Sequence, residues 1–227
     1  FQGSITAGAG SWDNYRTELD LSGPLNESGT LRGRGVVSIQ DKHSFIDSYK
    51  TERNLVYGVL EADLDEDTTL SVGASWSQDN NPGADWNGRG TNADGSFLDI
   101  PRSRRMSPDW SYWDKESTTV FADLTHHFAN DWTARLAASA VKSEMDMLGS
   151  YLYRPDPASR VMGFGIGAYH YENTQSSFDG YASGPFSLFG RTHELVIGGS
   201  YRKQDIDDGP GGWPLGFEYE FDPLAFD

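Results

Sequence analysis

Apolar and polar residues alternate at every second position along most of this chain, and this pattern constrains its fold more than any other feature. The pattern runs through residues 30–41, 54–64, 68–78, 117–128, 132–142 and 193–202. Within residues 68–78, for example, Leu70, Val72 and Ala74 alternate with Ser71 and Ser75. Because successive side chains of a strand point to opposite faces, each segment predicts a strand with one apolar and one polar face.

The connections between these segments are of two kinds. Short joints lie at residues 26–29, 65–67, 129–131 and around Gly190, whereas residues 79–114 and 149–160 form long polar or aromatic segments. An outer-membrane β-barrel requires short turns at one rim and long loops at the other. We therefore expect an all-β fold: an antiparallel up-and-down meander of about nine strands of about ten residues each, forming a segment of a transmembrane outer-membrane β-barrel.

Two soluble all-β proteins would leave a similar pattern. A carbohydrate-binding domain would turn its apolar rows into a dry interior between two sheets, and its exposed aromatic residues would stack on sugar rings. An all-β hydrolase would need two carboxylates that converge in a cleft. The barrel is favoured because the apolar rows are thin and rich in Ala and Gly, while the opposite rows carry charges of both signs.

Composition excludes several classes of function. The 34 acidic residues outnumber the 18 basic ones, which argues against a general nucleic-acid binder. The absence of cysteine removes disulfide and thiolate chemistry, and no run of eighteen apolar residues predicts a transmembrane helix. The sequence contains no nucleophile-elbow, zinc-protease or phosphate-loop motif, so we do not expect an enzyme.

Several motifs resemble a known family. Residues 10–16 (GSWDNYR), 20–26 (DLSGPLN) and 29–34 (GTLRGR) resemble the start of the barrel in TonB-dependent ferric-siderophore receptors, of the hydroxamate and pyoverdine type. Residues 101–103 (PRS) and 110–114 (WSYWD) look like the third extracellular loop of that family. The resemblance spans nearly the whole chain, and the first block of motifs is fairly specific.

The resemblance implies that residues 1–227 form one partial receptor barrel domain, without the plug and the C-terminal strands of the family. It implies a part in an outer-membrane receptor that imports ferric siderophores, located in the bacterial outer membrane. The implied partners are the ferric siderophore, outer-membrane lipid and lipopolysaccharide, and TonB through the missing plug, with no nucleic acid. Iron would arrive bound to its chelator, so no cofactor or metal is expected on protein side chains.

The candidate ligand-binding residues lie in the two long segments. They are Trp86, Trp110, Tyr112, Trp113 and Arg102 in the first, and Tyr151 and Tyr153 in the second. Aromatic faces supply apolar area and arginine supplies forked donors, which suits a flat, partly anionic chelate. As alternatives, Trp110 and Trp113 pack the loop against the barrel rim, and Arg102 makes contacts within the loop or with lipopolysaccharide phosphates.

Other polar residues favour structural roles. Arg32, Arg34, Glu18 and Asp20 are expected to face the lumen and, in an intact receptor, the plug. They would form ion pairs either across the barrel–plug interface or, as the favoured alternative, in a structural network within the lumen. The adjacent His126 and His127 point to opposite faces of a strand, so we do not expect them to share a metal ion.

Overall fold

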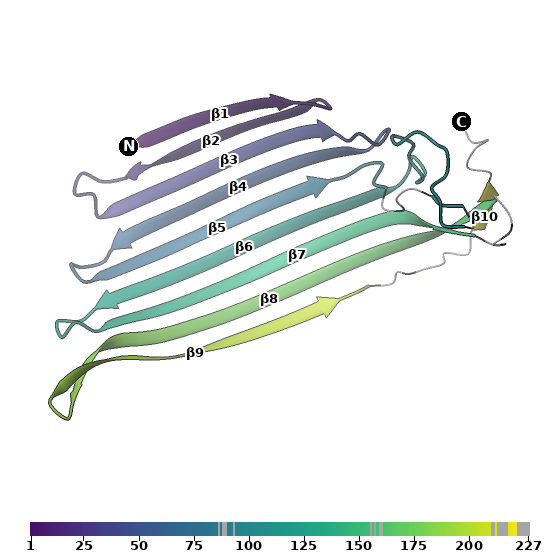
Figure 1. Cartoon of the computed structure of the whole chain (residues 1–227). Coiled ribbons are helices and arrows are strands. Elements are labelled where there is room, and N and C mark those ends of the chain that lie inside the picture. Colours follow the sequence, from purple (N-terminus) through teal and green to yellow (C-terminus); the bar gives the residue numbers. More distant parts are fainter. Residues whose placement is uncertain are drawn as a thin grey trace.

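The computed structural model is a single antiparallel sheet with ten strands among the described residues, in which the first nine strands lie side by side in sequence order (Figure 1). The strands are β1 (Gln2–Gly10), β2 (Asn14–Pro24), β3 (Leu31–His43), β4 (Lys50–Asp63), β5 (Thr68–Asn80), β6 (Tyr112–His127), β7 (Thr133–Tyr153), β8 (Met162–Leu188), β9 (Arg191–Asp207) and β10 (Glu218–Phe221). The predicted all-β meander is confirmed, with the short β10 as an additional strand on β8.

The structure describes all residues except 86, 88, 89, 93, 155, 157, 159, 160, 210, 211, 213–217 and 222–227, and describes only the backbone of residues 218–221. In this described part, no helix has the length and hydropathy needed to cross a bilayer.

The two kinds of connection lie at opposite ends of the sheet. The turns after β2, β4, β6 and β8 gather at the left of Figure 1, and the long connections 81–111 and 154–161 lie at the right. This arrangement confirms the two rims predicted from the sequence. The connection between β1 and β2 lies at the rim of the long loops but has only three residues. Two of them, Trp12 and Asp13, adopt positive φ.

Polar side chains close the short turns. The backbone N–H of Asp67 and the hydroxyl of Thr68 both donate to the Asp65 carboxylate at 2.9 Å, and they lower the pKa of that carboxyl. In the turn before β3, the Asn26 side chain accepts a hydrogen bond from the backbone of Leu31 at 3.0 Å. Such local acceptors satisfy the backbone donors that a tight turn leaves without a strand partner.

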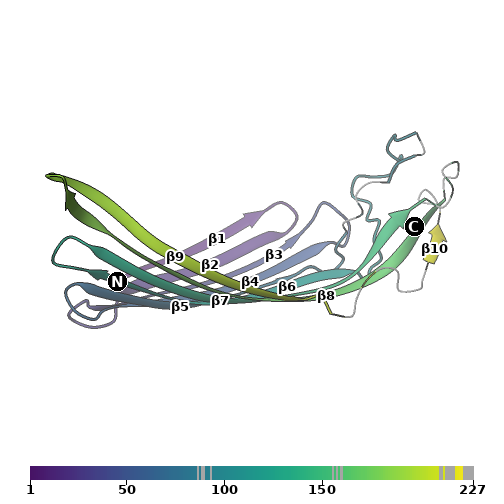
Figure 2. The same ribbon diagram turned by 90° about the horizontal axis from the view of Figure 1, so that it is seen from below.

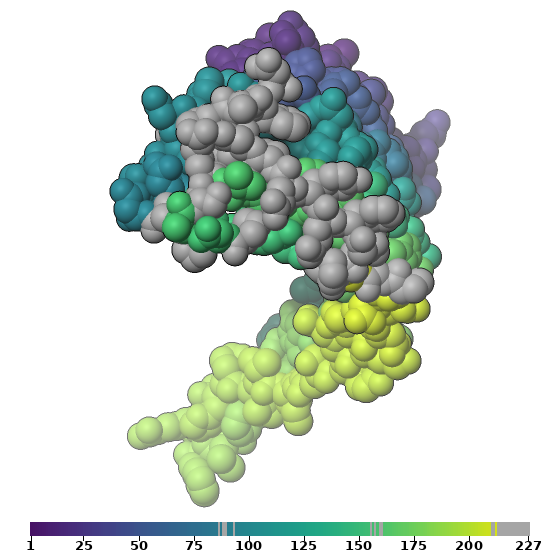
Figure 3. Space-filling model, turned by 90° about the vertical axis from the view of Figure 1, so that its right-hand side faces the viewer, coloured from purple at the N-terminus to yellow at the C-terminus, as the bar shows by residue number. Residues whose placement is uncertain are grey.

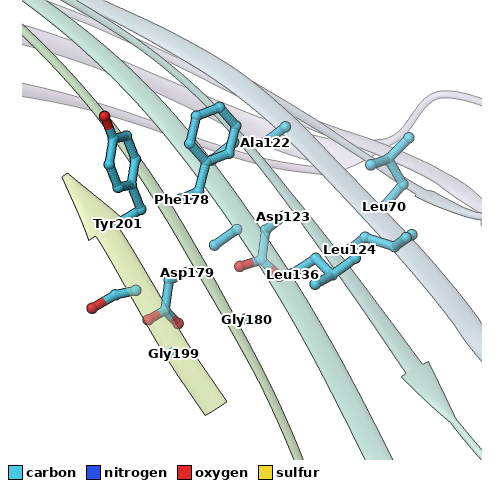
Figure 4. Close-up of a pocket in the computed structure, with 13 residues that line it drawn as sticks. Leu70, Ala122, Asp123, Leu124, Leu136, Phe178, Asp179, Gly180, Gly199 and Tyr201 are labelled. Carbon is cyan, nitrogen blue, oxygen red and sulfur yellow. The ribbon is translucent and has the colours of Figure 1, made fainter. Parts of the chain in front are cut away.

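One face of the sheet is apolar and open. Cross-strand registers align Leu60, Val72, Ala122, Ala138 and Phe178 in one continuous row across β4 to β8. Leu60 is 47% exposed and Phe178 is 59% exposed. Figure 4 shows Phe178 beside Tyr201 on this face, with Asp179 turned away from them. The apolar rows therefore do not line a dry interior, and the sandwich hypothesis of a carbohydrate-binding domain is wrong.

The opposite face carries paired charges, as is typical of the lumenal face of an outer-membrane barrel, and we call it the lumenal face. Arg34 contacts Asp20 at 2.7 Å and Arg32 contacts Asp63 at 2.6 Å. Arg135 contacts Asp123 at 2.5 Å on the same face. The predicted ion pairing of Arg32 and Arg34 is thus confirmed. Figure 2 shows that the sheet is curved, and Figure 3 shows the wall bending from the purple first strands round to the yellow β9.

Two strands are much longer than the predicted ten residues. β7 has 21 residues and β8 has 27, because the two strands pair with each other from Thr133↔Ser183 to Tyr153↔Gly163. This pairing continues beyond the first residue of β6, Tyr112, which lies opposite Leu148 of β7. The long connections are correspondingly shorter than predicted: the first spans 81–111 rather than 79–114, and residues 149–153 belong to β7.

Adjacent alanines in β7 provide a test of the two faces. Ala138→Arg places a charge in the apolar row, where a bilayer-embedded barrel should lose about 2–4 kcal/mol of stability. Ala137→Arg is the matched control, because its cross-strand neighbours are Asp123 and Asp179 on the polar face. The free energy of unfolding of the complete barrel in lipid vesicles, measured with urea, compares the two variants. An equal or larger loss for Ala137→Arg would contradict the assignment of faces.

Candidate ligand-binding site

Aromatic and methionine side chains gather on the polar face at the loop end of β6, β7 and β8. Registers place Trp113 opposite Met147 and Met147 opposite Tyr169. One step further into the sheet, Met145 pairs with Tyr171, and the Tyr169 and Tyr171 rings stack at 5.9 Å between centroids. We call the set the rim aromatic cluster; it comprises Trp113, Met145, Met147, Tyr151, Tyr153, Tyr169 and Tyr171.

Two glycines let the remaining tyrosines lie flat on the sheet. Tyr151 pairs with Gly165 and Tyr153 with Gly163 across β7 and β8. A Cβ atom at Gly165 would lie 2.4 Å from the Tyr151 ring, and one at Gly163 would lie 2.5 Å from the Tyr153 ring. The two rings lie 5.8 Å apart with a tilt of 36°. Any larger residue at either glycine would therefore displace its tyrosine.

A cation lies beside the cluster. The Lys115 ammonium sits 3.9 Å from the centroid of the Trp113 ring, a cation–π contact within the same strand and face. Lys115 also lies opposite Asp79. The Arg53 guanidinium donates two hydrogen bonds to the Asp79 carboxylate, through Nε and Nη2, each at 2.7 Å. The site thus combines flat apolar area, phenol groups and one lysine, which together can hold a planar ligand that carries negative charge.

The predicted candidates fall into separate environments. Trp113, Tyr151 and Tyr153 share the face of the rim aromatic cluster, whereas Tyr112 precedes Trp113 in β6 and faces the other side, opposite Leu148. Arg102 lies over the Phe45 ring at 4.4 Å, between two loops. Trp110 lies in the loop and is 41% exposed. Trp86 lies outside the described residues.

The long loop 81–111 has a small core of its own. Leu98, Ile100 and Met106 are buried together with Met162 of β8, and Leu152 of β7 packs against them. These contacts fix the loop on the far ends of β7 and β8. Such self-packed loops are frequently functional, because they hold side chains in place without forming regular structure.

A half-buried asparagine joins this loop to β7. The Asn87 side-chain amide donates to Ser107 at 2.9 Å and to Ser150 at 3.2 Å, while its carbonyl accepts from the Leu152 backbone at 3.0 Å. Ser150 is fully buried. The loop is also tied to the β3–β4 connection, where the Asp47 backbone donates to the Ser103 carbonyl at 2.8 Å. These hydrogen bonds therefore hold the described parts of the loop against β7 and the β3–β4 connection.

The loop arginines are engaged within the loops themselves. Arg105 forms an ion pair with Asp109 and its side chain is 12% exposed. Burial lowers the pKa of Arg105, while the Asp85 and Asp47 carboxylates act in the opposite direction. Together with the position of Arg102 over Phe45, this supports a role for these two arginines in loop structure.

Among the described residues, no three His, Asp or Glu side chains are grouped so that they could hold a metal ion. His126 contacts the Thr68 hydroxyl at 2.8 Å, and His127 contacts that of Thr133 at 3.1 Å. The two histidines thus have separate partners.

Sequence analysis did not assign four members of the rim aromatic cluster to the site. These four are Tyr169, Tyr171, Met145 and Met147. A signal was present, because Met or Tyr occupies positions 145, 147, 151 and 153, every second residue apart from Gly149, and Gly or Tyr recurs at the odd positions from 163 to 171. Pairing these two segments would have brought the residues together.

Comparison with known proteins gives a consistent result. No model of a protein family matches the chain. The chain is 43% identical over 207 residues to the ferripyoverdine receptor of Pseudomonas aeruginosa, covering 88% of this chain and 25% of that protein. It is 37% identical over 207 residues to the ferric-pyoverdine M114 receptor of a Pseudomonas species, covering 90% of this chain and 25% of that protein. The chain thus spans about a quarter of the length of these relatives.

A solved structure agrees with these relatives. The crystal structure of the outer-membrane ferripyoverdine receptor of Pseudomonas aeruginosa bound to ferripyoverdine superimposes with a TM-score of 0.82 at 40% identity. The match covers 89% of this chain and 27% of the receptor. The strand order, the two rims and the two faces described above are therefore those of part of a receptor barrel. The chain belongs to the family of TonB-dependent ferric-siderophore receptors and matches a segment of their outer-membrane β-barrel.

Proposed function

We propose that this chain is part of the barrel of an outer-membrane receptor that imports a ferric siderophore of the pyoverdine class. The observation that carries the proposal is the rim aromatic cluster, which lies on the lumenal face at the loop end of the sheet. There it would meet a chelate arriving from outside. The relatives named above are receptors for ferric pyoverdines, which supports this ligand class.

Different residues of the cluster would make different kinds of contact with the ligand. Trp113, Tyr151 and Tyr153 offer ring faces to the planar parts of a chelate, and Lys115 offers a positive charge beside the Trp113 ring. The iron would stay with its chelator, so no protein side chain needs to act as a metal ligand. Trp86, Trp110 and Arg102 belong to the same proposal as loop contacts, and Tyr112 has the weakest claim because it faces the other side.

The rest of the proposed function concerns the complete receptor. Residues 1–227 would form one part of a barrel domain, in which further strands pair with the outer edges of β1 and β9. We propose that the apolar rows contact outer-membrane lipid and lipopolysaccharide, and that TonB acts through a plug contributed elsewhere in the receptor. The relatives are transport receptors, and we propose that this protein likewise moves its ligand without catalysing a reaction.

Binding of ferric pyoverdine to the complete receptor tests the proposal, with neighbouring residues of β6 as a matched pair. Trp113→Ala should weaken binding by about 2 kcal/mol or more, roughly thirtyfold in Kd, because an aromatic anchor is lost. Tyr112→Ala should change Kd by less than about threefold, since that side chain faces away from the cluster. Fluorescence titration of cells or purified receptor measures both. Equal effects of the two substitutions would contradict the proposed site.

The order of loop 81–111 should also control affinity. Asn87→Ala removes the side chain that joins the loop to β7, so the loop should lose about 1–3 kcal/mol of local stability and the ligand should bind more weakly. Limited proteolysis within residues 81–111, together with the Kd for ferric pyoverdine, measures the effect. The control is Asn92→Ala, because Asn92 hydrogen-bonds Ser96 at the exposed tip of the same loop. A loop that resists cleavage as before in Asn87→Ala would refute this role.

A further inference from the structure

Below the rim aromatic cluster, the lumenal face of β6, β7 and β8 changes character. We call each row of cross-strand partners on this face a level. The next three levels of β6, β7 and β8 hold hydroxyl and amide side chains among a few apolar ones, and none of their described residues is ionisable. Of the seven polar residues at these levels, we call six the hydroxyl patch: Ser117, Ser139, Ser143, Asn173, Gln175 and Ser177. The seventh is Thr119 of β6. The level below it is charged again, with Asp123 and Asp179 on either side of Ala137.

A hollow connects the two regions. It has a volume of about 380 Å³ and is lined by Met145 and Tyr171 of the cluster and by Ser117, Ser143 and Asn173 of the hydroxyl patch. Its remaining lining is Ser77 and four ionisable residues at the level of the cluster and the rim: Asp79, Lys115, Glu116 and Glu144. The space beside the aromatic rings therefore continues down the wall onto the hydroxyl groups. A ligand that leaves the cluster along this wall meets the patch first.

The hydroxyls of the patch are arranged in pairs across neighbouring strands. Ser117 and Ser143 lie 2.9 Å apart, and Ser139 and Ser177 lie 2.7 Å apart. A hydroxyl pair shares one hydrogen atom, so each pair keeps a second hydrogen and free lone pairs for a ligand. The patch itself thus donates and accepts hydrogen bonds through neutral groups, and the one neighbouring charge in the β8–β9 register is Arg202, opposite Ser177.

The wall formed by β2 and β3 is different. Its lumenal side carries the ion pairs Arg16–Glu18 at 2.6 Å and Arg34–Asp20 at 2.7 Å. Tyr57 and Phe121 lie between the two walls. Their rings are stacked, with 6.4 Å between the centroids and 16° between the planes. Phe121 lies directly over Gly73, where a Cβ atom would be 2.4 Å from the ring. These two rings separate the charged wall from the hydroxyl patch.

The strength of the hydrogen bonds that each wall can form indicates along which wall a ligand can move. A hydrogen bond between neutral groups contributes about 0.5–1.5 kcal/mol net, whereas one to a charged group contributes about 1.5–3 kcal/mol. Passage through a pore requires several weak sites in place of one strong one, so that the ligand can leave each site again. The hydroxyl patch meets this requirement, because a chelate rich in amide and hydroxyl groups can exchange one neutral hydrogen bond for the next.

We propose that the hydroxyl patch is a second, transient site for the ferric siderophore, along which the chelate passes from the rim aromatic cluster into the lumen. The inference rests on the proposed function and adds a route to it. It assigns the route to the β6–β8 wall and excludes the charged wall of β2 and β3. The ligand class is a hydrophilic chelate with many neutral hydrogen-bonding groups.

Cysteine scanning of the complete receptor tests the route, because this segment contains no native cysteine. Ser139→Cys and Ser177→Cys preserve side-chain size, so the barrel should fold before a bulky maleimide is attached during transport of ferric pyoverdine. After labelling, we expect uptake of radioactive iron to fall by about tenfold or more while surface binding of ferric pyoverdine changes by less than about threefold. Mass spectrometry verifies the modification.

Two control positions localise the effect. Ser176→Cys is adjacent in β8 but shares the face of the apolar rows, and Val36→Cys lies on the lumenal face of β3. Labelling either should leave uptake unchanged. The route is refuted if Ser139→Cys and Ser177→Cys escape modification during transport, if their labelled forms import iron normally, or if labelled Val36→Cys blocks import equally. Failure of the unmodified receptor to bind ferric pyoverdine would instead refute the proposed function.

Discussion

The continuous antiparallel register is the constraint on which the rest of the structure depends. Every residue of β7 from Thr133 to Tyr153 has a partner in β8, so each face keeps its identity from one rim to the other. A slip of one residue would exchange the faces of the whole strand. The apolar rows, the hydroxyl patch and the rim aromatic cluster are therefore consequences of a single pairing. Individual ion pairs on the lumenal face add little to this, because they are exposed to water.

Much of the fold could be predicted from the sequence because its signals are local. Period-two alternation identifies a strand within a few residues, and Asn26 or Asp65 marks a turn through hydrogen bonds to its immediate neighbours. The extended ends of β7 and β8 were not predicted, because Met, Tyr and Gly at residues 145–153 and 163–171 obscure the contrast between apolar and polar positions. β10 has four residues, which is too short for a periodic signal.

The candidate site was less accessible to sequence analysis, since it depends on pairing between distant segments. Trp113, Tyr151 and Tyr153 were selected by residue type, and the structure places them on one face. Tyr112 was selected with Trp113 when both were assigned to a loop. Once residues 112–127 form a strand, neighbours must face opposite sides, which separates the two. The partnership of Tyr151 with Gly165 follows from the β7–β8 register alone and has no local sequence signal.

Under the proposed function, the lumenal face would allow capture and release of the ligand on one wall. Aromatic rings bind through large apolar contacts that do not exchange readily for water, which suits retention of a dilute ligand at the rim. Paired serines bind through neutral hydrogen bonds that water can replace at small cost, which suits release. Because both sets project from the same strands, a chelate that loosens from Tyr171 is already beside Ser143 and Asn173. In the proposed route, affinity would therefore fall along the strand direction, and a conformational change elsewhere in the receptor would need only to open the space in front of this wall.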